Sequence, residues 1–165
     1  MLYNILGFND SEFPAGLGWH DKICQGFHER SIWALSRALM VPAPETAKLV
    51  RYAGAEFHWK NRKVLLAPGT SETLFRIAVA FHRLSAVLKD DVIVATWLRN
   101  PRREVLDLVP ILLLTSEPGA MLVMEAIAKI KPPKTVERNA PEPEDDTASP
   151  EEARETDLDA EATDE

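Results

Sequence analysis

The segment from Trp97 to Ile130 constrains the fold of this 165-residue chain more than any other segment. It turns at Asn100-Pro101 and then carries an apolar run over 109–114. Residues 116–119, Ser-Glu-Pro-Gly, interrupt that run before a second apolar stretch over 120–130. This pattern predicts a helical hairpin with more apolar surface than two short helices can hide from each other. The rest of the chain or a partner must therefore cover it.

Apolar residues three and four positions apart predict further helices on the N-terminal side of this hairpin. Trp19, Ile23 and Phe27 are spaced in this way, and Pro44 suits the first turn of a helix. No segment has the alternation of a strand that competes with this pattern, so we expect an all-α fold. The expected helices lie near 19–26, 31–40, 44–53 and 70–88, with another running from Asp90 or Asp91 to Trp97.

Charge divides the chain into two parts. Residues 1–131 hold 16 basic and 13 acidic side chains, a net charge of +3, whereas residues 132–165 hold 3 and 13, a net charge of −10. The acidic part has no aromatic residue and few aliphatic ones, so it cannot bury enough apolar area to offset chain entropy. We expect a disordered acidic tail over 132–165, and a mildly basic body that remains compatible with a nucleic-acid partner.

The cysteine count and the N-terminus predict the compartment. Cys24 is the single cysteine, so no internal disulfide can form, and its apolar surroundings in the sequence favour a buried thiol. The first residues lack the positive charge of a signal peptide, and no apolar run approaches the roughly 18 residues that span a bilayer. We therefore expect a cytoplasmic protein without a membrane contact.

The patterns of common enzymes are missing from the sequence. The four histidines, His20, His28, His58 and His82, are not spaced as metal ligands. Phosphate-binding, dinucleotide-binding and serine-hydrolase motifs do not occur. We therefore expect no enzyme, no catalytic residue, no metal and no cofactor.

Two short expected helices, 31–40 and 44–53, and the basic segment 55–64 have the spacing of a helix-turn-helix module. Such a module places side chains in the major groove and holds phosphates with neighbouring cations. The alternative, a solvated basic helix in an ordinary bundle, is left open by spacing and charge. The residues expected to face bases are Glu56, His58, Trp59, Lys60 and Arg62, and those expected at phosphates are Lys48, Arg51 and Lys63.

Ordered positions in the hairpin match a family pattern. They are Trp97-Leu98, Pro101, Val105, Pro110, Leu113-Leu114-Thr115, Gly119, Val123, Ile127 and Ile130. The helix 71–78, Ser-Glu-Thr-Leu-Phe-Arg-Ile-Ala, agrees with the same pattern. Through these residues the chain resembles the Xre/MbcA/ParS antitoxins of bacterial type II toxin–antitoxin modules, over roughly 19–130.

The resemblance implies both an architecture and partners. It implies an N-terminal lead (1–18), an Xre-like helix-turn-helix half (19–69) and a connecting helix with a small helical toxin-binding domain (70–131), ahead of the tail. It also implies a homodimer that neutralises a cognate toxin, commonly a RES-domain enzyme that consumes NAD, and that represses its own operon through operator DNA. The residues expected at the toxin are Trp97, Arg99, Arg102, Arg103, Pro110, Leu114, Gly119, Leu122, Val123, Ile127, Lys129 and Lys131.

The chain also departs from the family pattern. Asp107 and Leu108 stand where glycines are usual, and His58-Trp59-Lys60 replaces an arginine-rich run. Two alternatives therefore stay open, namely a stand-alone helix-turn-helix regulator and a partner-binding adaptor that has lost DNA binding.

Overall fold

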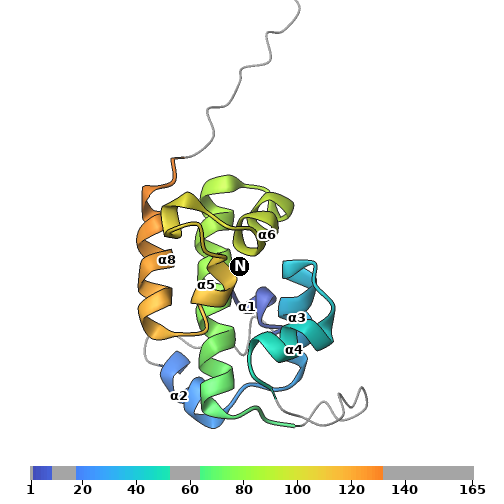
Figure 1. The fold of residues 1–165 in the computed structure, drawn as a ribbon. Helices are drawn as coiled ribbons and strands as arrows, with labels where there is room; N and C mark the ends of the chain where they lie inside the picture. Colours follow the sequence, from blue (N-terminus) through green and yellow to red (C-terminus); the bar gives the residue numbers. More distant parts are fainter. Residues whose placement is uncertain (1, 9–17, 53–63, 132–165) are drawn as a thin grey trace, which may run out of the picture. The chain divides into compact units, whose positions relative to one another are not determined.

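The computed structural model describes residues 2–8, 18–52 and 64–131, and helices dominate them (Figure 1). These residues contain no strand, only two isolated bridges, His28 with Leu65 and Arg102 with Leu108. The expected all-α class is therefore confirmed. The elements are α1 (Leu2–Ile5), α2 (Gly18–Gln25), α3 (Arg30–Leu39), α4 (Ala43–Leu49), α5 (Pro68–Leu88), α6 (Asp91–Arg99), the 3₁₀ helix η2 (Arg103–Val105), α7 (Pro110–Leu113) and α8 (Glu117–Lys129).

Helix α5 is the centre of the fold, and α1, α2, α3, α6 and α8 all pack against it (Figure 1). Its buried stripe is the one that the sequence predicts, with Leu74, Ile77, Phe81 and Leu84 almost fully buried. The helix begins at Pro68, two residues before the expected start. Glu72 therefore lies beyond the first turn, where it pairs with Arg76 (Oε1–Nη2, 3.0 Å).

The hydrophobic core runs without a break through both halves of the body that the sequence distinguishes. Leu35 and Leu39 of α3, Ile77 of α5, Leu98 of α6 and Val123 of α8 belong to one cluster. Burial of these side chains is the main source of stability in such a fold. Any motion of α3 and α4 relative to α6–α8 must therefore disturb a shared core.

The N-terminal segment docks on this core, as its apolar residues predict. Leu6 is fully buried, and Phe8 is 6% exposed. The Phe8 ring meets Trp19 and Phe27 edge to face, at centroid distances of 5.8 Å and 5.3 Å. These aromatic contacts attach residues 2–8 and α2 to the N-terminal half of α5, where the Trp19 ring also contacts the Phe75 ring (centroid distance 5.0 Å).

Phe27 is buried, but it does not lie on α2, whose last residue is Gln25. Gly26 adopts φ +90°, and a Cβ there would lie 2.2 Å from the carbonyl oxygen of Leu66. Only glycine permits so close an approach. Phe27 then donates its N–H to Ser71 Oγ (2.9 Å), and Leu66 donates to the Phe27 carbonyl (2.7 Å). The spacing of Trp19, Ile23 and Phe27 thus correctly predicts that Phe27 is buried, but it wrongly places Phe27 on the helix.

Helices α3 and α4 both end in a residue with left-handed backbone that is not glycine. Met40 (φ 54°) follows α3. Its N–H donates to the Arg37 carbonyl, and the N–H of Val41 donates to the Ser36 carbonyl. Arg51 (φ 55°) follows α4. Its N–H donates to the Lys48 carbonyl, and the N–H of Tyr52 donates to the Ala47 carbonyl. Both ends have the paired bonds of a Schellman motif. Helix α4 therefore ends at Leu49, four residues before the expected end.

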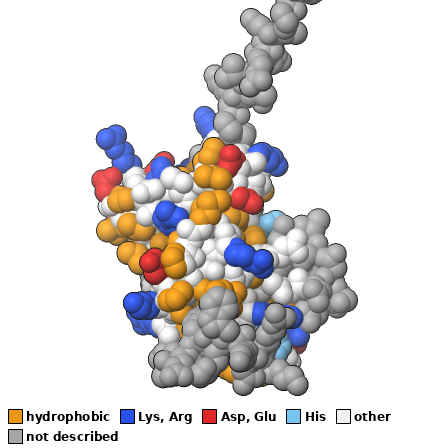
Figure 2. Space-filling model, turned by 90° about the vertical axis from the view of Figure 1, so that its right-hand side faces the viewer, with side chains coloured by type: hydrophobic (Ala, Val, Ile, Leu, Met, Phe, Trp, Pro, Cys, Tyr) orange, Lys and Arg blue, Asp and Glu red, His pale blue; other side chains and the backbone are white. Residues whose placement is uncertain are grey.

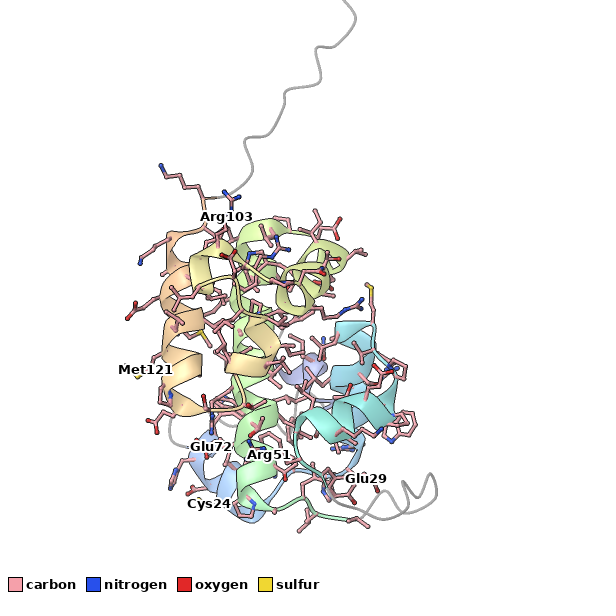
Figure 3. The ribbon with its side chains drawn as sticks, in the orientation of Figure 1. Cys24, Glu29, Arg51, Glu72, Arg103 and Met121 are labelled. Carbon is pink, nitrogen blue, oxygen red and sulfur yellow. The ribbon has the colours of Figure 1, made fainter. Side chains whose placement is uncertain are left out.

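Cys24 is exposed, so the expected buried thiol is wrong. Trp19 and Ile23 form the inward stripe of α2, and Cys24 lies one residue, about 100° around the helix, from Ile23. Its sulfur lies 3.6 Å from His20 Nε2 on the same helix (Figure 3). Short amphipathic helices bury one stripe only, which leaves this thiol in solvent.

Capping residues define the helices that follow α5. The Asp90 carboxylate accepts hydrogen bonds from the backbone N–H groups of Val92 (2.8 Å) and Ile93 (3.1 Å), as the sequence predicts for the start of α6. Ser116 likewise accepts the N–H of Gly119 (3.3 Å) at the start of α8. Residues 116–119, expected to separate two helices, therefore belong mostly to the first turn of α8.

Candidate partner-binding surface

The connection between α6 and α7 is a tightly bonded loop rather than a simple turn. Arg102 donates its N–H to the Leu108 carbonyl (3.1 Å), and Asp107 donates to the Arg102 carbonyl (2.9 Å). Within this loop η2 places Val105 in the core with no exposed surface. The loop is thus anchored from inside, and its outer residues are held in fixed positions.

The Arg102 side chain fastens this loop to α6. Its Nε donates to the Trp97 carbonyl (3.2 Å), and its guanidinium lies 5.7 Å from the centroid of the Trp97 ring. Such a cation–π contact is worth about 0.5–2 kcal/mol, depending on solvent exposure. Because Trp97 is itself buried, the Arg102 contacts fix the loop to the core.

Two successive residues of this loop, Leu106 (φ 61°) and Asp107 (φ 59°), adopt left-handed backbone. A leucine in this region costs roughly 1–2 kcal/mol relative to its ordinary conformations. The Leu106 side chain is also 74% exposed, so burial does not offset this cost. A strained backbone that holds an apolar side chain in solvent is typical of a functional surface.

Further apolar side chains follow within a few residues. Leu112 on α7 is 58% exposed, and Leu108 is also exposed. Arg103, between them and α6 in sequence, is exposed and has no side-chain partner among the described residues (Figure 3). We call Arg103, Leu106, Leu108 and Leu112 the loop surface. Exposed leucines within nine residues of an unpaired guanidinium offer the apolar and basic groups found in many protein interfaces.

Six of the residues expected at the toxin lie in the core instead. Trp97, Leu114, Val123 and Ile127 are each 6% exposed or less. Pro110 begins α7 and is buried, and Gly119 is buried where α8 passes α7. A Cβ at Gly119 would lie 2.2 Å from the Leu113 carbonyl oxygen. In this conformation these six positions pack the hairpin and present little surface to solvent.

The remaining expected toxin contacts differ in their surroundings. Arg99 is exposed, but its guanidinium donates to two carbonyl oxygens of α3 and its cap, those of Leu39 (3.2 Å) and Met40 (3.1 Å). Leu122 is half-buried, whereas Lys129 and Lys131 are exposed at the end of α8. Of the whole expected set, Arg103 belongs to the loop surface and Arg102 holds it in place.

The expected DNA-contacting residues are only partly within the described structure. Lys48 on α4 and Arg51 just after it are exposed, as a phosphate contact requires (Figure 3). Glu56, His58, Trp59, Lys60, Arg62 and Lys63 lie outside the described residues. Among the described residues, α3 and α4 pack on each other and are joined by a three-residue connection (Figure 1).

Sequence reasoning missed Leu106, Leu108 and Leu112 because apolar residues were assigned to the interior of the hairpin. One signal was available, since Asp107 stands where the family pattern has a glycine. A glycine position replaced by another residue marks a backbone that glycine adopts easily, and Asp107 does have positive φ. Met121 on α8, which is 63% exposed and points away from the fold, was also missed (Figure 3).

Other classes of site find little support in the part of the chain that the structure describes. Its helices include none with the length and apolar character needed to cross a membrane. Its His, Cys, Asp and Glu side chains form no group of three or more that could hold a metal ion. Exposed hydrophobic side chains are instead interspersed with Lys and Arg on the face drawn in Figure 2.

Comparison of this chain with protein-family models gives no match, and comparison with curated protein sequences gives none either.

Proposed function

We propose that this protein is an antitoxin-type binding protein, which neutralises a cognate toxin by docking through the loop surface. The observation that carries the proposal is Leu106, an exposed leucine held by left-handed backbone on a loop anchored in the core. A hydrogen-bonded loop backbone loses little conformational entropy on binding, so an apolar side chain that it presents suits a role as an anchor in a partner pocket.

The loop surface lies within residues 97–130, whose pattern resembles the toxin-binding part of the Xre/MbcA/ParS antitoxins. The resemblance suggests the class of partner, a RES-domain toxin in the cytoplasm, and the exposure of the loop surface supports it as the position of the contact. Arg103 adds a cation to the rim of this contact, where it would steer an acidic partner surface towards the leucines. In this proposal the protein itself is no enzyme, since any NAD chemistry belongs to the toxin.

Co-expression with the product of the adjacent gene tests the proposal. We expect the neighbour alone to arrest growth and deplete cellular NAD, and co-expression of this chain to restore both. The two proteins should also co-purify as one complex. A toxic neighbour that stays toxic in the presence of this chain, with no complex, would contradict the proposal.

A second element of the proposal is autorepression through α3 and α4, as a homodimer on operator DNA. The support is the short connection between these packed helices and the exposed cations Lys48 and Arg51. Electrophoretic mobility shift with the chain's own promoter, at several salt concentrations, tests it. We expect a shift that weakens in the charge-reversed Lys60→Glu/Arg62→Glu variant. Toxin binding without any shift at low salt would select the adaptor instead.

A further inference from the structure

A groove of about 480 Å³ opens between α1, α3, α5 and the first turn of α6. Ligand sites in proteins commonly measure about 300–1,000 Å³. In Figure 1, α1 lies between α5 and α3, and all three helices contribute residues to the lining of this groove. The groove is separate from the loop surface, because none of its lining residues belongs to residues 102–112.

One part of the lining is apolar. Ala34 and Ala38 come from α3, Ile5 from α1 and Phe81 from α5. The small side chains of α3 leave room for the groove. Ile5 and Ala38 are half-buried, whereas Ala34 (5% exposed) and Phe81 (2% exposed) contribute only a little surface. This part fits the flat or branched body of an organic molecule and offers it no hydrogen bond.

The rest of the lining is polar and carries uncommitted donors. Arg37 on α3 and His82 on α5 are exposed, and neither side chain has a hydrogen-bond or ion-pair partner among the described residues. The carboxylate of Asp91 is already engaged, since Ser85 Oγ donates to its Oδ1 (2.9 Å). Asp91 also lies in the first turn of α6, where the positive end of the helix dipole offsets its charge.

We propose that this groove binds a small organic acid, with a carboxylate attached to a compact apolar body. The Arg37 guanidinium presents a planar fork that matches a carboxylate, and His82 on α5 offers a second donor from the same lining. The apolar body lies on Ile5 and Ala38, the half-buried apolar residues of the lining. The inference rests on the groove alone, so it stands or falls independently of toxin binding.

Occupancy of this groove would reach both parts of the fold. Arg37 and Ala38 belong to α3, the first helix of the α3–α4 pair, whereas His82 and Asp91 belong to α5 and α6. A ligand that touches all three helices stabilises their mutual packing and so adds to the free energy of unfolding. The acid is therefore an effector that strengthens the attachment of α3 to α5 and α6.

Backbone-amide NMR of the full chain with 2-naphthoate tests the inference, and the neutral 2-naphthamide serves as the matched ligand. We expect saturable shifts of the amides around Arg37, Ala38, His82 and Ser85 with the acid, and at least tenfold weaker binding of the amide. Arg37→Ala should weaken naphthoate binding by about tenfold, and His82→Ala by less. Both positions are exposed, so these variants should unfold at nearly the wild-type temperature.

Arg83→Ala is the matched control variant, because Arg83 is an exposed cation beside His82 that does not line the groove. It should bind naphthoate as the wild type does. No saturable shift with naphthoate, equal binding of acid and amide, or equal losses in Arg37→Ala and Arg83→Ala would each overturn the inference.

Discussion

The guanidinium of Arg99 donates to the Leu39 carbonyl at 3.2 Å, across 60 residues of chain. The same nitrogen lies 3.1 Å from the Met40 carbonyl oxygen, so Arg99 caps the C-terminus of α3. A cation at this end of a helix meets both unsatisfied carbonyl groups and the negative end of the dipole. This contact joins the α3–α4 pair to α6, the helix that leads to the loop surface.

Removal of the Arg99 side chain should weaken the packing of α3 against α6. Arg99→Ala should lower the free energy of unfolding by about 1 kcal/mol, since two charge-assisted hydrogen bonds at an exposed site are lost. Urea denaturation at constant m-value measures the change. Arg103→Ala is the control, because that guanidinium has no partner among the described residues, and it should change stability by less than about 0.5 kcal/mol. Equal effects of the two variants would show that the cap adds nothing.

Gly119 should tolerate no side chain. A Cβ there would meet the Leu113 carbonyl oxygen at 2.2 Å, and that oxygen belongs to the backbone of α7. Gly119→Ala should therefore destabilise the protein by about 3 kcal/mol through overpacking. Gly69 supplies the matched control, as a Cβ there has open space within 4 Å. Gly69→Ala should leave the thermal midpoint unchanged or raise it, and a comparable loss at both positions would refute the predicted clash between α8 and α7.

Asparagine in place of an exposed residue with left-handed backbone should stabilise the protein. Leu106→Asn should raise the free energy of unfolding by about 1 kcal/mol, because asparagine accepts this backbone at lower cost and the lost leucine buried little surface. Met40→Asn should behave alike, since Met40 is also exposed with φ 54°. Thermal unfolding of both variants checks this, and a fall in midpoint for Leu106→Asn would mean that the leucine stabilises its own loop.

The Tyr52 phenol should lose its proton only at a higher pH than an ordinary tyrosine. Burial raises the pKa of Tyr52 above its ordinary value of about 10, and the Glu29 carboxylate adds to the rise. The folded state therefore holds this proton more tightly than the unfolded state. The resulting stabilisation is full below the ordinary pKa and is lost as pH rises through the folded pKa.

Phenolate absorbance of a Tyr3→Phe variant isolates Tyr52, because the chain has two tyrosines. The titration midpoint should lie above that of free tyrosine and move down in Glu29→Gln. An ordinary midpoint, unmoved by Glu29→Gln, would exclude the expected burial of Tyr52 near the start of α3.

Sequence alone located much of the fold for identifiable reasons. The stripe of α5 was predictable because 3.6-residue periodicity over 21 residues leaves few alternatives. The start of α6 was predictable because aspartate is a strong capping residue. The end of α3 lies within one residue of the expected end. The end of α4 was not predictable, since Arg51 holds the left-handed position where glycine would have marked it.

The candidate site was harder to predict than the fold. Hydrophobic pattern assigns leucines to the interior, and Leu106 is exposed only because two left-handed residues turn the chain at that point. The family pattern covers the segment that contains the loop surface, but its matched residues are mostly those that pack the hairpin, such as Leu114 and Val123. Positions of contact on such a hairpin depend on the loop conformation, which its side chains alone do not specify.

The dissociation constant between the full chain and the adjacent toxin, measured for wild type, Leu106→Asn and Met40→Asn, tests the central proposal most directly. Both substitutions remove an exposed apolar side chain from left-handed backbone, but only Leu106 belongs to the loop surface. We predict that Leu106→Asn weakens binding by at least tenfold, in line with an anchor residue, and that Met40→Asn leaves it unchanged. Tight binding of the toxin by Leu106→Asn, equal to that of the wild type, would contradict the proposal that the loop surface is where the toxin docks.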